Sequence, residues 1–260
     1  MVNVFQKKVL MLALYAGEIM MRNGAEVYRV EDTMTRICKS CKIDSVEVFA
    51  TPTGIFISMD KGGDEDDTQT YIKRISGINT DLRKISDVNH FSRQSTTTDL
   101  SVDEGMEILT NIDEKKGYPL ALRVIGAIMV SAAFCVIMGG KPVDCCIAVV
   151  SGALCYLFSR LLKRVDINSF VTGFCSCALA SVIALAASLT IEGANYNPII
   201  INSIILFVPG VALTNSIRDF LSGDMLSGVA RLMEAMLTAI SLAAGAGVVI
   251  KIFDILGGAI

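Results

Sequence analysis

The stretch Val208-Pro-Gly-Val-Ala-Leu-Thr-Asn-Ser-Ile-Arg-Asp-Phe220 decides how the second half of the chain is interpreted. It begins inside a 25-residue run without charge, residues 193–217, which is long enough to cross a bilayer. Pro209 has no backbone N–H to donate and Gly210 adds freedom, so we expect the helix to break there and restart at Val211. Backbone groups freed inside lipid have no water to bond. Such a break therefore indicates a place where the backbone meets something other than lipid.

The position of the break favours a binding role. Twelve residues separate Asn197 from Pro209, about 18 Å at helical rise, which is near the middle of a hydrocarbon core of about 30 Å. The restarting helix would aim its free N–H groups at the membrane centre, where a substrate carboxylate is a natural partner. The alternative is a plain proline kink, repaired by Ser203 or by a neighbouring helix. The predicted substrate-binding residues are Asn202, Pro209, Gly210, Thr214 and Asn215.

Composition divides the chain into a charged first part and an apolar second part. Hydrophobic residues make up 52% of the 260 residues, and mean hydropathy is +0.56. Most charged residues precede Pro119, which excludes an ordinary soluble globule for the remainder. The sequence predicts an α+β cytoplasmic domain over 1–117, followed by an all-α membrane domain of five transmembrane helices over 118–260. The expected spans are 119–140, 142–162, 167–190, 197–217 and 228–252.

The first part shows the patterns of a small mixed domain. Apolar spacing and turn signals predict two helices, then strands, then two more helices, with Ser101 and Glu104 forming a capping box. The polar loop 60–67 lacks the spacing of a calcium loop and is interpreted as a solvated turn. The expected helices are 4–22, 25–40, 81–92 and 102–115, and the expected strands are 43–50, 55–59 and 69–75.

No residue pattern indicates an enzyme, a metal site or a cofactor. Cys38 and Cys41 form a lone C-x-x-C, and a structural zinc site needs four ligands. The only histidine, His90, has no nucleophile motif beside it. Arg29 with Glu26 or Glu31 is expected to be a surface pair, and Glu18 and Arg22 are further candidate polar residues. The other six cysteines are expected to act as small hydrophobes in the spans: Cys135, Cys145, Cys146, Cys155, Cys175 and Cys177.

Basic residues predict the orientation in the membrane. They cluster before the first span, between the second and third, and between the fourth and fifth, while the opposite side has only Lys141 and Lys251. The positive-inside rule then places the N-terminal domain in the cytoplasm and the C-terminus outside. The slight net acidity of the chain, −3, gives no reason to expect nucleic acid as a partner.

Two further features lie in the spans and at their ends. Small residues recur every fourth position at Ala235, Ala239, Ala243 and Gly247, and again at Gly173, Cys177 and Ser181, which predicts close helix packing within this chain or with another. Charged residues gather at the cytoplasmic ends of the last two spans, where membrane anchoring and a gate or proton relay are both open interpretations. The predicted gate or proton-coupling residues are Arg218, Asp219, Asp224, Arg231 and Glu234.

The order and spacing of short motifs resemble the threonine/serine exporter family in its split form. The N-terminal matches are Gly17, Gly24-Ala25, Val27, Arg29, Glu31 and the Thr-Pro-Thr-Gly turn before Ile-Phe-Ile-Ser. The C-terminal matches are Pro209-Gly210, the segment 215–219, Gly223-Asp224 and Arg231. The resemblance implies export of small carboxylated metabolites, either threonine and serine or a dicarboxylate such as succinate.

The resemblance also implies a partner. Fused members add a second set of about five spans, so a separate small membrane subunit with about five spans is expected beside this chain. The function predicted is a subunit of a secondary efflux transporter in the cytoplasmic membrane, driven by the proton gradient. A membrane-anchored metabolite sensor is the alternative, and a membrane enzyme is the third possibility. Sequence does not decide which acid is carried or which ion is coupled.

Overall fold

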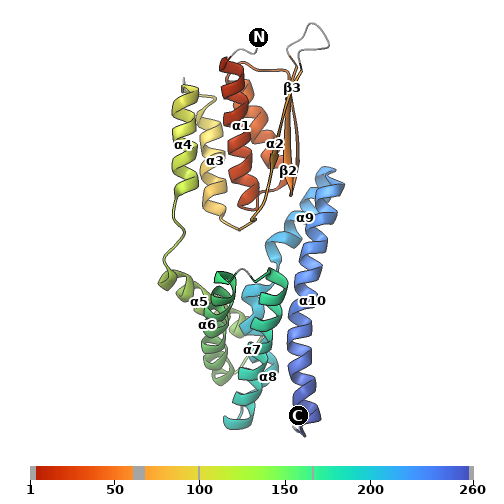
Figure 1. Cartoon of the computed structure of the whole chain (residues 1–260). Coiled ribbons are helices and arrows are strands. Elements are labelled where there is room, and N and C mark those ends of the chain that lie inside the picture. The colour runs from red at the N-terminus through yellow and green to blue at the C-terminus, as the bar shows by residue number, and fades with distance from the viewer. Residues whose placement is uncertain (1–3, 61–67, 99, 166, 258–260) are drawn as a thin grey trace. The chain divides into compact units, whose positions relative to one another are not determined.

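The computed structural model describes residues 4–60, 68–98, 100–165 and 167–257. Over these residues it contains ten α-helices, a short 3-10 helix and a three-stranded sheet (Figure 1). The chain divides into two compact units. Unit 1 comprises residues 1–117 and 211–232, and unit 2 comprises 118–210 and 233–260. The loop predicted over 60–67 lies, apart from Asp60, outside the described residues.

Unit 1 is built on two packed helices and a small sheet. Helix α1 (Val4–Arg22) packs against α2 (Val27–Ser40), and both cover one face of the antiparallel sheet β1–β2–β3 (Figure 1). The strands are β1 (Val46–Thr51), β2 (Gly54–Met59) and β3 (Gln69–Arg74). Helices α3 (Leu82–Gln94) and α4 (Val102–Glu114) lie against α1. The predicted elements and the Ser101–Glu104 capping box are confirmed, with ends shifted by up to three residues.

The core of unit 1 explains why these segments fold together. Large side chains such as Ile19, Met34 and Ile57 are fully buried between the two helices and the sheet. Gly17 lets α2 approach closely, because a Cβ there would lie 3.0 Å from Cγ of Met34. Alternation along β2 places Ile55, Ile57 and Met59 inward.

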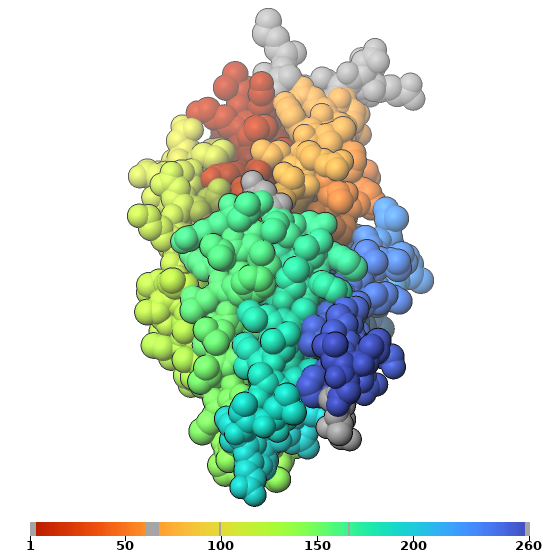
Figure 2. All heavy atoms as spheres, turned by 60° about the horizontal axis from the view of Figure 1, so that its bottom comes forward, coloured from red at the N-terminus to blue at the C-terminus, as the bar shows by residue number. Residues whose placement is uncertain are grey.

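Unit 2 is a bundle in which α6 is central. Helix α6 (Pro142–Arg164) packs against α5 (Leu120–Ile137), α7 (Ser169–Thr190) and α8 (Tyr196–Ile204). Its buried face is small or polar, with Ala148, Ser151, Gly152 and Cys155, so neighbouring helices approach closely. The space-filling view shows the atoms of α5, α6 and α7 packed against one another (Figure 2).

The last helix, α10 (Met225–Ile255), meets α7 through small residues. A Cβ on Gly245 would overlap the carbonyl oxygen of Phe174 and lie 3.2 Å from the amide nitrogen of Ala178. The hydroxyl of Ser241 donates to the carbonyl of Phe170. The predicted stripe Gly173, Cys177 and Ser181 on α7 is buried. Of the predicted stripe on α10, Ala235 is buried, whereas Ala239, Ala243 and Gly247 are exposed. The α10 face that packs within this chain is therefore Ser241, Leu242 and Gly245.

The predicted fold class is wrong in its organisation. The chain is not an α+β domain followed by a separate five-helix domain, because residues 211–232 belong to the same compact unit as the N-terminal residues. Counting uncharged residues assigned 211–217 to a span, but the polar side chains of this region make specific bonds with residues 21–27. The chain is predominantly helical, with one small sheet.

Within the described residues, four helices are long and apolar enough to cross a membrane: α5, α6, α7 and α10. A fifth candidate is a bent pair, residues Tyr196–Phe207 and Gly210–Leu221, with an angle of 59° at the break. The 3-10 helix η1 (Ile205–Phe207) ends at Val208, and α9 (Gly210–Ser222) starts directly after Pro209. The break predicted from Pro209-Gly210 is confirmed, one residue earlier than expected.

Candidate functional site

In unit 1, four side chains from α9 and α10 hold the turn between α1 and α2. They are Asn215, Arg218, Asp219 and Arg231, and we refer to them as the clamp. The turn they hold is Gly24-Ala25-Glu26-Val27, whose sharp path requires the positive φ of +88° at Gly24. Their partners lie about 190 to 210 positions earlier in the sequence.

Asp219 completes the N-terminus of α2. Its carboxylate is fully buried, and Oδ1 accepts a hydrogen bond from the amide of Val27 at 3.3 Å. The residue at the N-cap position, Glu26, makes no side-chain cap bond of its own. A carboxylate from α9 therefore satisfies a donor that a local Ser, Thr or Asp would ordinarily satisfy, and it also faces the positive end of the helix dipole.

Arg231 balances that buried charge. Its Nε lies 3.1 Å from Oδ2 of Asp219, and both side chains are at least nine-tenths buried. Its Nη2 donates to the carbonyl of Ala25 at 2.6 Å, and Nδ2 of Asn215 donates to the carbonyl of Gly24 at 2.9 Å. Because a buried carboxylate and guanidinium are stable only as a pair, each of these residues depends on the other.

A second ionic group surrounds Glu26. Its carboxylate pairs with Arg218 of α9 and lies 3.4 Å from Nη1 of Arg29. The pairing of Glu26 with Arg29 was expected from the sequence, but the pairing with Arg218 was not. The residues near Glu26 in the sequence do not predict a partner that lies 192 positions away.

Two further carboxylates lie close to the clamp. The backbone amide of Asp224 donates to the carbonyl of Asp219 at 2.9 Å, which closes the turn between α9 and α10. Glu31 on α2 accepts a hydrogen bond from the amide of Ala50 at 2.8 Å. Burial raises the pKa of Glu31, the charges of Asp224 and Asp219 raise it further, and the bond from Ala50 opposes the shift. Glu31 thus binds a proton more readily than an ordinary glutamate.

Unit 2 buries several uncharged polar side chains whose polar atoms have no hydrogen-bond partner. Asn202 on α8 is fully buried, and neither its amide nitrogen nor its amide oxygen has a hydrogen-bond partner. The hydroxyls of Ser131 on α5 and Ser176 on α7 are likewise buried without a partner. An amide offers donors and acceptors together, so Asn202 is suited to hold a polar ligand inside an apolar bundle.

The predicted residues are distributed over both units. Among the predicted substrate residues, Asn202 is buried in unit 2, Pro209 is half-buried, and Asn215 is buried in unit 1. Gly210 and Thr214 are exposed, and the hydroxyl of Thr214 donates to the carbonyl of Val211. A common substrate site for these five residues remains a prediction.

The predicted gate residues are partly gathered. Arg218, Asp219, Asp224 and Arg231 all lie in unit 1, around the α1–α2 turn. Glu234 is exposed and belongs to unit 2. Arg231 thus pairs with Asp219 and not with Glu234, although Arg231 and Glu234 stand three apart on one helix. The role of these residues as a gate or proton relay also remains a prediction.

Among the described residues, no group of three or more His, Cys, Asp or Glu side chains is placed to hold a metal ion. The Cys38–Cys41 pair contains two free thiols, and burial raises the pKa of Cys38 to about 12. A thiol that stays protonated is a poor nucleophile and a poor metal ligand. His90 is exposed at the surface of α3.

Comparison with known proteins identifies relatives over nearly the whole chain. Residues 11–253 match a family described as "Putative threonine/serine exporter". The chain is 25% identical over 94% of its length to a probable threonine/serine exporter of Mycobacterium tuberculosis, and it covers 46% of that protein. It is 23% and 24% identical to proteins of Klebsiella aerogenes and Escherichia coli named probable succinate transporter subunit YjjP, and it covers 97% of each.

The relatives differ in how much of their own length this chain covers. The chain spans about half the length of the M. tuberculosis exporter but nearly all of each YjjP protein. No solved structure matches the chain. Together with several helices apolar enough to cross a bilayer, the family match indicates a multi-pass protein of the cell membrane. The match covers far more than half of the chain, which therefore belongs to the threonine/serine exporter family.

Proposed function

We propose that this chain is one subunit of a secondary exporter for small carboxylated metabolites, either threonine and serine or a dicarboxylate such as succinate. One relative is named a threonine/serine exporter and two are named succinate transporter subunits, which supports this range. The second subunit is a separate small membrane protein with about five spans. Its existence is supported by the word subunit in two of those names and by the length of the M. tuberculosis relative.

The observation that carries the proposal is the unpaired amide of Asn202. A buried polar group without a partner costs about 1–3 kcal/mol, so a stable bundle would not be expected to keep one without use. Asn202 stands on α8, three residues before the start of η1 at Ile205 and seven residues before Pro209. We assign this amide to the polar part of the substrate.

The polar residues buried in unit 2 also bear on the choice of substrate. Within the described part of unit 2, the only buried charged side chain is Asp144. Hydroxyls and an amide suit a zwitterionic amino acid, whose own charges balance. A dicarboxylate would need a cation, which the second subunit would have to supply.

The clamp is the proposed inner gate, and Glu31 with Asp219 and Asp224 is the proposed proton-binding group. We place residues 1–117 in the cytoplasm and the C-terminus outside, as the distribution of basic residues favours. Proton binding would neutralise the Glu31 carboxylate, which interacts with Asp219 of the Asp219–Arg231 pair. Protonation would thereby change the electrostatic energy of the clamp.

Efflux from vesicles that contain both subunits tests the proposal. Labelled threonine, serine and succinate are loaded separately, and the release of at least one is expected to exceed that from protein-free vesicles. Asn202→Leu removes the unpaired amide with little change in volume, so it should abolish efflux while leaving thermal stability equal or higher. Asn197→Ala, an exposed position on the same helix, is the matched control and should retain efflux.

Two results would contradict the assignment. Efflux of none of the three acids would exclude the substrate class. Normal efflux by Asn202→Leu would show that the amide does not contact the substrate.

A further inference from the structure

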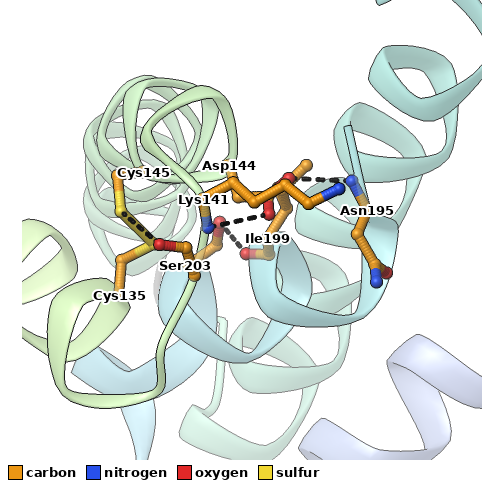
Figure 3. Close-up of a disulfide and its surroundings, with 8 residues drawn as sticks. Cys135, Lys141, Asp144, Cys145, Asn195, Ile199 and Ser203 are labelled. Carbon is orange, nitrogen blue, oxygen red and sulfur yellow. Dashed lines mark hydrogen bonds between the residues drawn. A yellow bond between two sulfur atoms is a disulfide. The ribbon is translucent and has the colours of Figure 1, made fainter. Parts of the chain in front are cut away.

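The turn between α5 and α6 is closed by a disulfide. Cys135 near the end of α5 and Cys145 in the first turn of α6 are bonded, with their Cα atoms 5.5 Å apart (Figure 3). The sequence interpretation treated both as small hydrophobes, and for this pair it is wrong. The remaining cysteines in the described residues are free thiols, including Cys146 next to the bond.

Two glycines, Gly139 and Gly140, let the turn approach the sulfur of Cys135 closely. The amide of Gly140 donates to the carbonyl of Cys135 at 2.9 Å, and a Cβ on Gly140 would lie 2.5 Å from its Sγ. Gly139 has a positive φ of 70°, which a glycine adopts without strain. The two glycines therefore allow the chain to fold back closely enough for the two sulfurs to meet.

A buried carboxylate connects this turn with a second loop. Asp144 is 1% exposed, and its Oδ2 accepts from the amide of Lys141 at 3.2 Å. Its Oδ1 accepts from the amide of Asn195 at 2.8 Å (Figure 3). Nζ of Lys141 lies 3.5 Å from the carbonyl oxygen of Gly193. The α5–α6 turn and the α7–α8 loop thus form one closed end of unit 2, which we refer to as the end cap, residues 138–145 and 191–195.

We propose that Cys135–Cys145 is a disulfide modification site and that the end cap faces the oxidising, non-cytoplasmic side of the membrane. The inference rests on the orientation proposed above and does not depend on which acid is transported. Disulfides persist in oxidising compartments and are reduced in the cytosol. Lys141 is the only basic residue of the end cap, which agrees with the outer side of a membrane protein.

Formation of the bond requires an oxidant, which is an extracytoplasmic protein thiol oxidase. One thiolate of the pair attacks the oxidase disulfide, and a mixed disulfide forms as one oxidase thiolate leaves. The second cysteine then attacks that mixed disulfide. The chain has lost two electrons and two protons, and the oxidase has become a dithiol. Cys146 is a free thiol in the structure, so the expected product is the Cys135–Cys145 pair.

Counting reactive thiols tests whether the bond exists. The full chain is denatured in detergent and labelled with a polymer-linked maleimide, which adds one mass step per thiol. Of the eight cysteines, six should label before reduction and all eight after it. Cys135→Ser should give seven steps in both conditions, because its partner is released. The matched control Cys146→Ser should give five steps before reduction and seven after. Eight steps for the unmodified chain without reduction would overturn the proposal.

A second experiment tests the side of the membrane. The chain is produced without oxygen in bacteria with and without their extracytoplasmic thiol oxidase, and thiols are trapped with acid before labelling. Six steps are expected with the oxidase and eight without it. Equal counts in the two strains would contradict an extracytoplasmic origin. This result would leave the transport proposal untouched, just as lack of transport would leave the disulfide untouched.

Discussion

At the scale of single residues, the buried ion pair of Asp219 and Arg231 constrains substitution in unit 1. Asp219 receives the amide of Val27 and the charge of Arg231, while Arg231 also bonds the carbonyl of Ala25. Each side chain thus has two partners, and neither can be removed without leaving a buried group unpaired.

Asp219→Asn should destabilise the protein by about 3–5 kcal/mol, because it leaves the buried guanidinium of Arg231 without its counter-charge. Thermal unfolding in detergent measures the loss. Glu234→Gln, at an exposed position on α10, should change stability by less than about 0.5 kcal/mol. The double change Asp219→Asn with Arg231→Met should recover part of the loss, and strictly additive losses would show that the two residues do not act as a pair.

Glu31→Gln tests the proton-binding carboxyl. Since the folded-state pKa of Glu31 is raised above its ordinary value of 4.5, the charged form disfavours folding. This penalty is fully present above the raised pKa, falls as pH drops through it, and vanishes below the ordinary value. Glu31→Gln should therefore unfold at a higher temperature than the parent near neutral pH, with the gap closing as the pH approaches 4.5. A gap that does not change with pH would contradict the assignment.

Sequence identified the polar residues of the clamp but not their partners. Asn215, Arg218, Asp219 and Arg231 stood out because charged and amide groups are costly near a membrane. Their partners are mainly backbone groups of the α1–α2 turn, which carry no side-chain signature. Asn202 was predicted as a site residue because it precedes a helix break, and that role stays a prediction. Cys135 and Cys145 looked like ordinary apolar positions ten residues apart.

At the scale of the elements, α7 and α10 approach most closely at Gly245. Gly245 lies against the backbone of Phe174 and Ala178, so a side chain there has no room unless a helix moves. Gly247, one half-turn later, has nothing within 4 Å of a Cβ. These two glycines therefore form a matched pair for mutation.

Gly245→Ala should destabilise the protein by about 1–3 kcal/mol through overpacking, although alanine is the better helix former. Gly247→Ala should be neutral or slightly stabilising, because only helix propensity changes. Thermal unfolding of both variants in the same detergent is the measurement. Equal stability of the two variants would mean that α7 and α10 do not meet at Gly245.

The broken element at Pro209 gives a prediction about transport. Pro209→Ala supplies a backbone N–H that can bond the carbonyl of Ile205, so η1 and α9 would tend to join into a straighter helix than the present 59° bend. Efflux from vesicles should fall by about tenfold or more while the protein still inserts in the membrane. Pro198→Ala is the control, because Pro198 lies in the first turn of α8, where no helical bond is lost. Normal efflux by Pro209→Ala would show that the break is a structural kink without a role in transport.

Elements were easier to predict from the sequence than their grouping. Periodicity located each helix and strand of residues 4–114, because each buries one apolar face. The same rule located the apolar helices but not the return of residues 211–232 to unit 1. A run of uncharged residues indicates high hydropathy. It does not indicate which distant backbone groups the side chains in that run bond.

At the scale of the whole molecule, a stripe of small residues on α10 is exposed among the residues that the structure describes. Ala239, Ala243 and Gly247 on α10 are exposed, whereas the comparable stripe on α7 is buried. Small residues in a membrane helix allow another helix to approach closely. The proposed second subunit is expected to occupy this stripe.

Ala243→Leu should therefore weaken association with the second subunit without altering the stability of this chain alone. The added bulk separates helix backbones that would otherwise approach closely, and a weakening of about 1–3 kcal/mol corresponds to roughly tenfold or more in affinity. Both subunits are produced together, one is captured through a tag, and the amount of the other is measured. Val248→Leu, also exposed on α10, adds bulk away from the stripe and should leave capture unchanged. Efflux should fall with capture in Ala243→Leu vesicles, because the transport pathway requires both subunits. Full efflux by this chain without any second subunit would contradict the two-subunit proposal.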